Sequence, residues 1–199
     1  MKRIGLFLLF SGLMVGCGQA NHESQRATSS EVNEQPAGIE ADLIPFKFQK
    51  AISDADLIAE VIIKEKKEEV DVKPLPYTVF SAEVNNIYKN PSTNQNVSTI
   101  TLKQQGNSEW TVNHLELFKP GETYILFLKE TKGSKSDYWI IGEATGMFKV
   151  IDDDTIVKML GPSEEFNTIE VETKNKNPYI NHGSQVLDKN EFIRKINES

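Results

Sequence analysis

Short runs of alternating apolar and polar residues dominate the middle of the chain. Residues 97–104 show the pattern most clearly, because Ile100 and Leu102 fall on one side of an extended segment and Thr99 and Thr101 on the other. Similar runs recur between turns rich in Pro, Gly and Asn. The last of these runs, residues 168–171, suits a short edge strand. The predicted strands are residues 77–84, 97–104, 124–128, 137–141, 147–151, 155–160 and 168–171.

Residues 57–70 fit two patterns. Ile58, Val61 and Ile62 follow helical spacing, whereas the β-branched run from Val61 to Ile63 is typical of a strand that leads into a charged extension. We favour the strand, partly because of the resemblance described below, and keep the helix as the alternative.

Two short helices are predicted, one before these strands and one after them. The first ends before Ser53 and carries four apolar residues on one face, Leu43, Phe46, Phe48 and Ile52. The second begins near Asp188, with Glu191 three residues later, and its apolar stripe is Phe192, Ile193 and Ile196. Together with six or so strands, this predicts a mainly β fold, a small Greek-key barrel of five to six strands with a short N-terminal helix and a C-terminal helix.

The N-terminus has the order of features found in an exported lipoprotein. Lys2 and Arg3 precede an apolar run from Ile4 to Gly16, which is too short to span a bilayer but suits a signal peptide. The run ends in Met-Val-Gly-Cys, which resembles the lipobox of bacterial lipoproteins, where the cysteine thiol receives the lipid. We therefore expect cleavage before Cys17 and a lipid anchor on that residue. Two or more acyl chains would make the anchoring stable.

The composition downstream of Cys17 predicts a tether followed by one domain. Residues 18–40 are polar and poor in large aliphatic side chains, so residues 17–40 are expected to form a flexible linker spanning roughly 25 Å. Residues 41–160 are then the barrel domain, and residues 161–199 are a C-terminal extension with the edge strand and the helix. Because no second cysteine exists, the domain must fold without disulfides. A net charge of −7 argues against nucleic-acid binding.

Several segments in this order resemble the OB-like, tissue-inhibitor-of-metalloproteinases-like barrel domains of Gram-positive secreted and cell-surface proteins. The resemblance covers roughly residues 50–160 and implies a five- to six-stranded Greek-key barrel. It does not carry the inhibitory mechanism, because the N-terminal cysteine here is expected to be lipidated and no disulfide can fix it. The segments that carry the resemblance are residues 55–63, 77–89, 100–106, 118–128 and 138–150.

The sequence contains no catalytic motif, no metal-ligand spacing and no phosphate-binding loop, and no cofactor is expected. Trp110 and His114 are the candidate ligand-binding residues, because they lie in a loop at one end of the predicted barrel. For Trp110, a plug over the barrel end is an equally good interpretation, and His182 is the other histidine in the folded region. Asp152 to Asp154 are interpreted as a solvated hairpin turn rather than a cation site. Four scattered carboxylates could meet only through the fold, namely Glu83, Glu109, Glu116 and Glu143.

These observations predict a lipid-anchored protein on the extracytoplasmic face of the cell membrane. Its expected role is that of a non-enzymatic binding or accessory module, with a protein or a cell-envelope polymer as partner. The alternative is an envelope enzyme or protease-inhibitor-like protein that uses a loop cleft at the barrel mouth. Converging charged groups with displaced pKa values would favour the enzyme, and a flat aromatic patch would favour binding. A purely structural or immunity role, and the type of cell envelope, are left open.

Overall fold

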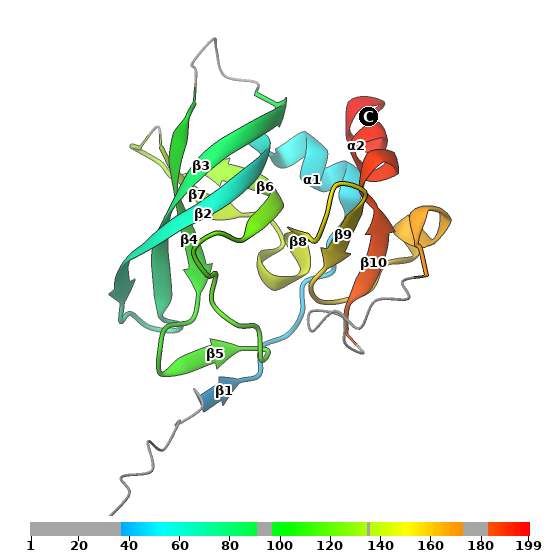
Figure 1. The fold of residues 1–199 in the computed structure, drawn as a ribbon. Coiled ribbons are helices and arrows are strands. Elements are labelled where there is room, and N and C mark those ends of the chain that lie inside the picture. Colours follow the sequence, from blue (N-terminus) through cyan, green and yellow to red (C-terminus); the bar gives the residue numbers. More distant parts are fainter. Residues whose placement is uncertain (1–36, 91–96, 135, 173–182) are drawn as a thin grey trace, which may run out of the picture. The chain divides into compact units, whose positions relative to one another are not determined.

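The computed structural model describes residues 37–90, 97–134, 136–172 and 183–199 (Figure 1). The described chain is mainly β, as the sequence predicts. Its strands are β1 (Ala37–Ile39), β2 (Leu57–Val70), β3 (Tyr77–Lys89), β4 (Thr99–Gln105), β5 (Trp110–Val112), β6 (Thr123–Glu130), β7 (Asp137–Ile140), β8 (Met147–Val150), β9 (Thr155–Lys158) and β10 (Gln185–Asp188). Its helices are α1 (Phe48–Asp54), the 3₁₀ helices η1 (Glu143–Gly146) and η2 (Glu164–Ile169), and α2 (Lys189–Asn197).

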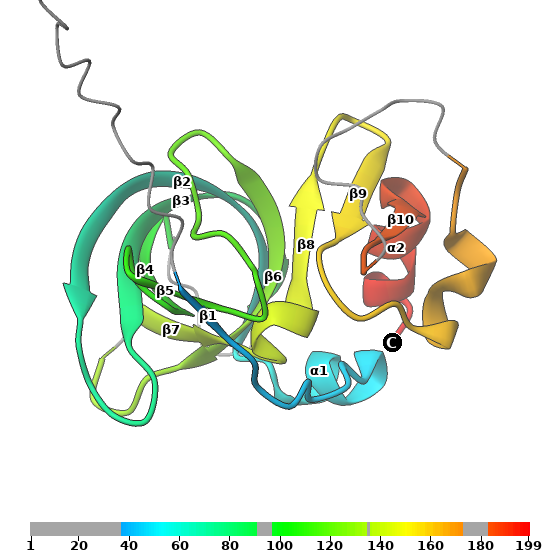
Figure 2. The ribbon, with the colours of Figure 1, turned by 90° about the horizontal axis from the view of Figure 1, so that it is seen from below.

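Five strands close into a barrel, and Figure 2 looks into one of its ends. Strands β2, β3 and β4 pair in antiparallel succession, β4 pairs with β7 in parallel, and β6 pairs with both β7 and β2. Numbered by their order in the chain, these five strands therefore follow one another around the barrel as 1-2-3-5-4-1. This closed order is compatible with an OB-like barrel. The predicted barrel is confirmed, and residues 57–70 are a strand.

Strand β6 buries both of its faces, because it belongs to two hydrophobic cores. Tyr124, Leu126 and Leu128 point into the barrel, whereas Ile125 and Phe127 join a second core outside it. This explains why residues 124–128 are apolar at every position, as expected of a central strand.

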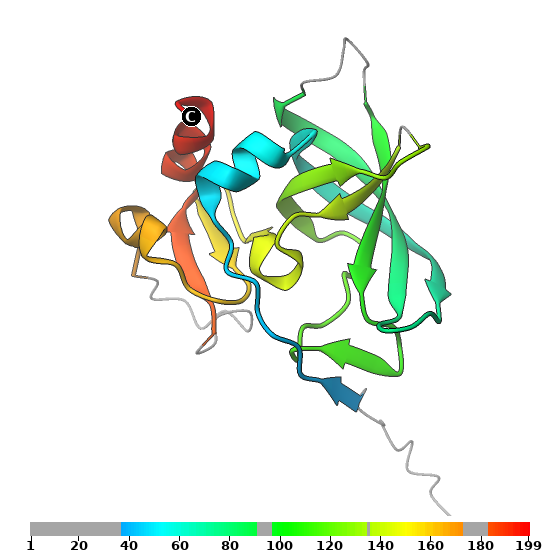
Figure 3. The same ribbon diagram turned by 180° about the vertical axis from the view of Figure 1, so that it is seen from behind.

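The second core lies where β6 leaves the barrel and pairs with β8, which continues the sheet through β9 to β10. Helices α1 and α2 and the 3₁₀ helix η2 pack against this extension (Figure 3). Its centre is a cluster of phenylalanines in which Phe148 and Phe192 have ring centroids 4.5 Å apart. The other members are Phe46, Phe48, Phe127 and Phe166.

Two predicted elements differ from the structure. The N-terminal helix begins at Phe48 rather than near Leu43, because Pro45 disfavours helical geometry in the residue before it and Leu43 is exposed. It also ends at Asp54 rather than before Ser53. Residues 168–171 do not form the predicted edge strand. Residues up to Ile169 belong to η2, whose spacing places Phe166 and Ile169 together in the second core, and Glu170 makes only an isolated bridge to Leu187.

The C-terminal helix is confirmed: Asp188 caps it by accepting a 2.9 Å hydrogen bond from the backbone N–H of Glu191. Residues 37–39, expected within the linker, form β1. None of the helices within the described ranges is long and apolar enough to span a bilayer.

Candidate functional site

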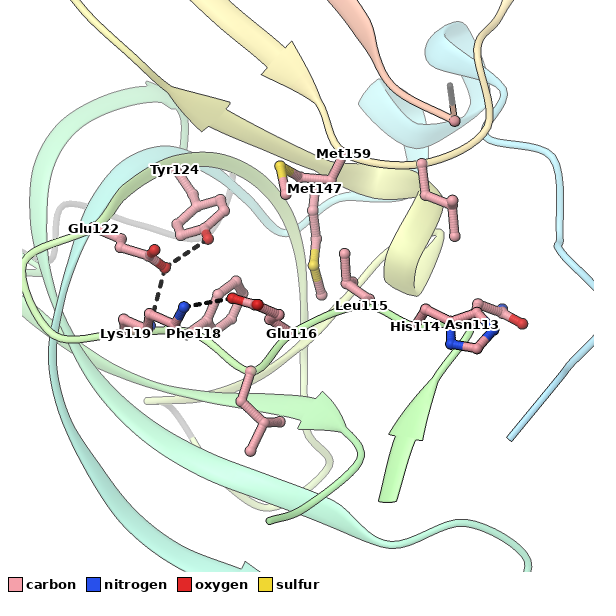
Figure 4. Close-up of a pocket in the computed structure, with 13 residues that line it drawn as sticks. Asn113, His114, Leu115, Glu116, Phe118, Lys119, Glu122, Tyr124, Met147 and Met159 are labelled. Atoms are coloured by element: carbon pink, nitrogen blue, oxygen red, sulfur yellow. Dashed lines mark hydrogen bonds and ion pairs between the residues drawn. The ribbon is translucent and has the colours of Figure 1, made fainter. Parts of the chain in front are cut away.

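The loop from Asn113 to Glu122, between β5 and β6, lines a cavity of about 560 Å³ (Figure 4). Met147 and Met159 extend between two polar groups of residues, with Glu122 and Tyr124 on one side and Asn113 and His114 on the other. This volume is within the range of small-molecule and side-chain binding sites. The apolar lining residues are Leu115, Leu117, Phe118, Met147, Met159 and Leu160.

A second cavity, of about 600 Å³, lies against the same loop and includes Phe80 and Thr111 in its lining. Five residues of the loop line both cavities. They are His114, Glu116, Leu117, Phe118 and Lys119. Residues 113–119, which contain these five, therefore form a wall between the two cavities. The loop therefore presents side chains to a ligand on two sides.

The loop enters this wall through two consecutive left-handed residues, Asn113 (φ 51°) and His114 (φ 56°). This geometry costs roughly 1–2 kcal/mol for a residue with a side chain, less for asparagine, and it persists only where surrounding contacts fix it. The contacts come from the segment around β1. The backbone N–H of Asn113 donates to Ile39 O over 2.8 Å, Ala41 N–H donates to Asn113 Oδ1 over 2.9 Å, and His114 Nε2 lies 2.7 Å from Glu40 Oε1.

The middle of the wall is held by the buried amide of Gln104, in β4. Gln104 Nε2 donates to Glu116 O over 3.0 Å, and Gln104 Oε1 accepts from Phe118 N–H over 2.8 Å. The Phe118 ring packs on Tyr124 at 4.7 Å and on Phe80 at 5.4 Å between centroids. The middle of the wall is therefore fixed by contacts within the chain, which reduces the entropic cost of binding there.

Glu122 lines the first cavity, and only 12% of its side chain is exposed. It forms an ion pair with Lys149, accepts a 2.8 Å hydrogen bond from Tyr124 Oη and a 2.9 Å hydrogen bond from the backbone N–H of Lys119. Burial by itself would raise the pKa of Glu122, but the hydrogen bonds and the charge of Lys149 outweigh it and hold the pKa below 4.5. Glu122 is therefore ionised and engaged at neutral pH, as a structural anion would be.

Of the two predicted ligand-binding residues, the structure places only His114 at the cavities. Trp110 lies in β5 with 42% of its surface exposed, and it lines neither cavity. Cys17 and His182 lie outside the described residues.

The four predicted carboxylates have separate surroundings. Glu83 pairs with Lys64 and Glu116 with Lys119, while Glu109 is exposed. Glu143 lies in η1, where burial raises its pKa to about 7 and its Oε2 atom is buried without a hydrogen-bond partner. It does not line either cavity.

Asp152 to Asp154 form the exposed turn between β8 and β9, as predicted. Over the described ranges, no three His, Cys, Asp or Glu side chains gather as a metal site would require.

Sequence reasoning missed most of the cavity residues, among them Glu122, Tyr124, Met147 and Met159. The Glu122–Lys149 pair joins positions 27 residues apart, and only the pairing of β6 with β8 brings them together. Met147 begins β8 and Met159 directly follows β9. In the sequence, an apolar residue at such a position is interpreted as part of the core and not as part of a binding site. The sequence matches no protein-family model and no curated protein sequence.

Proposed function

We propose that this protein is a tethered binding module that receives an apolar segment of a partner protein at the wall formed by residues 113–119. The observation that carries the proposal is the pair of cavities on the two sides of one ordered loop. A small ligand would occupy one cavity, whereas a polypeptide segment can place side chains in both. Methionine side chains adapt to differently shaped apolar partners, which suits the first cavity to this task.

The surroundings of the charged groups favour binding over catalysis at this site. A general base needs a free carboxylate lone pair within reach of the substrate, and a pKa close to the working pH. Glu122 lacks the second property, because its pKa is lowered, and three donors from Lys149, Tyr124 and Lys119 already hold its oxygens in place. The group with a pKa near neutrality, Glu143, lies elsewhere.

We further propose that the module is attached to the extracytoplasmic face of the membrane by lipid on Cys17. Support comes from the order of basic residues, apolar run, small residue and cysteine, and from the polar linker that follows. The relationship to tissue-inhibitor-of-metalloproteinases-like domains is also a proposal. The strand order of the barrel supports its OB-like part, and the finer relationship rests on the sequence resemblance alone.

Site-specific photocrosslinking in intact cells tests the binding proposal. A photoreactive amino acid replaces Glu116, whose side chain is 70% exposed and lines both cavities. The control carries the same group at Ile87, an exposed apolar position on β3. We expect one protein to be crosslinked from position 116 and not from position 87, through a segment that contains large apolar residues. Equal labelling from both positions, or labelling of a polysaccharide alone, would contradict the proposal.

A further inference from the structure

We propose that β1 is a strap that sets the conformation of the binding wall, so that a pull on the N-terminal side of β1 changes the first cavity. This inference concerns the regulation of the proposed binding site and rests on that function. Its physical basis is independent of any partner, because it follows from contacts within the chain.

The strap is held by few interactions. β1 is three residues long and pairs only with β5, in a two-stranded parallel sheet that is separate from the eight-stranded sheet of the domain (Figure 1). Two-stranded sheets are marginally stable without further packing. Ala37 and Gly38 are exposed, and so is the contact between Glu40 and His114, which contributes little in water. The strap can therefore detach while the barrel and the second core stay folded.

The strap nevertheless contacts both left-handed residues of the wall. Ile39 O and Ala41 N–H bond to Asn113, and Glu40 reaches His114. The imidazole of His114 also lies over Gly38, because a Cβ atom on Gly38 would be 3.1 Å from His114 Cε1. When these contacts are lost, the left-handed geometry at positions 113 and 114 loses the partners that fix it.

The resulting change is confined to one end of the wall. Gln104 holds Glu116 and Phe118 from the other side of the loop, so those residues keep their places when the strap detaches. The residues that lose contacts are Asn113 and His114, whereas Leu115 keeps its bond to Val112 O and its place against the barrel core. Both Asn113 and His114 line the first cavity, but only His114 lines the second. Detachment is therefore expected to alter the first cavity more than the second.

The position of β1 in the chain lets the strap transmit a force to the first cavity. β1 is the first described element, and the residues before it are those that the sequence predicts to be a linker to the membrane. Tension in that linker, or a partner strand that takes the place of β1 on β5, would act first on the strap. The two states of the strap would then be read out as two shapes of the first cavity.

The test uses the full chain with Gly38→Val and measures amide hydrogen exchange at residues 109–115 and the methyl NMR signals of Met147 and Met159. A Cβ atom on residue 38 would lie 3.1 Å from His114 Cε1, so the imidazole must shift away from the strap. We therefore expect exchange in this segment to rise about tenfold and both methyl signals to move. Ala37→Val is the matched control, because it adds the same kind of side chain at an exposed neighbouring position. It should change neither observable.

The double variant Gly38→Val with His114→Ala removes the displaced ring and should restore slow exchange. If Gly38→Val lowers the yield of folded protein, Asn113→Ala replaces it, because it deletes the acceptor of the Ala41 N–H and should speed exchange in the same segment. Unchanged exchange in the variants, or faster exchange with both methionine signals unmoved, would overturn the proposal. Since no partner is added, this result is independent of whether the crosslinking experiment finds one.

Discussion

Glu122 and Lys149 form a buried ion pair that joins β6 to β8 beside the first cavity. Their side chains are only 12% and 5% exposed, respectively. Lys149 lies opposite Tyr124 in the register of the two strands, and its ammonium group is 5.6 Å from the centre of the Tyr124 ring. One interaction thus links the barrel, the strand that leads to the second core, and the lining of the first cavity.

Replacing Glu122 by Gln should destabilise the fold by about 3 kcal/mol, because it removes the carboxylate that compensates a buried lysine charge. The control is Glu116→Gln, since the Glu116–Lys119 pair is exposed and should be worth less than about 1 kcal/mol. Chemical denaturation at pH 7 measures both. Equal losses of unfolding free energy in the two variants would show that the buried pair stabilises the fold no more than the exposed pair does.

The buried carboxyl of Glu143 gives a prediction for pH dependence. Burial raises its pKa to about 7 from the ordinary 4.5, so the folded state favours the protonated form. Its stabilising contribution is complete below pH 4.5 and is lost as the pH rises through 7. The loss amounts to about 3 kcal/mol by linkage.

Glu143→Gln should remove that loss. The variant is therefore expected to gain stability relative to the unmodified chain between pH 5 and pH 8, as measured by denaturant unfolding. Asp56, Glu60, Glu69 and Glu122 have lowered pKa values, so their stabilisation appears above pH 4 to 5 and is common to both proteins. A constant difference between the two proteins across this range would contradict the prediction.

The C-terminal segment is expected to be essential for folding. Residues 161–199 supply Phe166, Ile169, Leu187, Phe192 and Ile196 to the second core. At about 2 kcal/mol for each buried side chain, their loss is comparable to the whole stability of a domain. A chain that ends at residue 160 should lose cooperative thermal unfolding, whereas removal of the exposed residues 197–199 should cost little. A truncated chain with an unchanged melting temperature would mean that residues 41–160 fold independently.

The proposed lipid anchor depends on one sulfur atom, that of Cys17. Metabolic labelling with a radioactive fatty acid should mark the chain, and Cys17→Ser should abolish both the label and the membrane association. Labelling that persists in the variant, or an unlabelled precursor in the cytosol, would exclude lipidation at this position.

Most of the fold was predictable where the pattern is local. The run at 124–128 indicated a strand buried on both faces, and the β-branched residues after Leu57 indicated a strand although helical spacing was also present. The prediction was wrong at residues 168–171, because a short apolar pair can satisfy either geometry. In the structure, the helical geometry of these residues places Phe166 in the phenylalanine cluster of the second core. The local sequence does not locate that cluster, because α1, α2 and β8 form it together.

The candidate site was predictable only in part. His114 was noticed because histidine is rare in this chain and the loop was recognisable. The strained geometry of Asn113 and His114 is fixed by β1, which lies about 70 residues away in sequence within a segment that reads as a linker. β1 and β5 have three residues each, which is too short for a recognisable alternation of apolar and polar positions in the sequence. Such a contact could be found only in the folded structure.

The most direct test of the proposed function uses the two methionines of the first cavity as NMR probes. The segment crosslinked at position 116 is prepared as a peptide and titrated against the full chain with labelled methionine methyl groups. We predict that the signals of Met147 and Met159 shift to saturation, and that replacing the apolar residues of the peptide by serine abolishes the shift. If the peptide binds while both signals stay in place, the cavity is not the binding site and the proposed function is wrong.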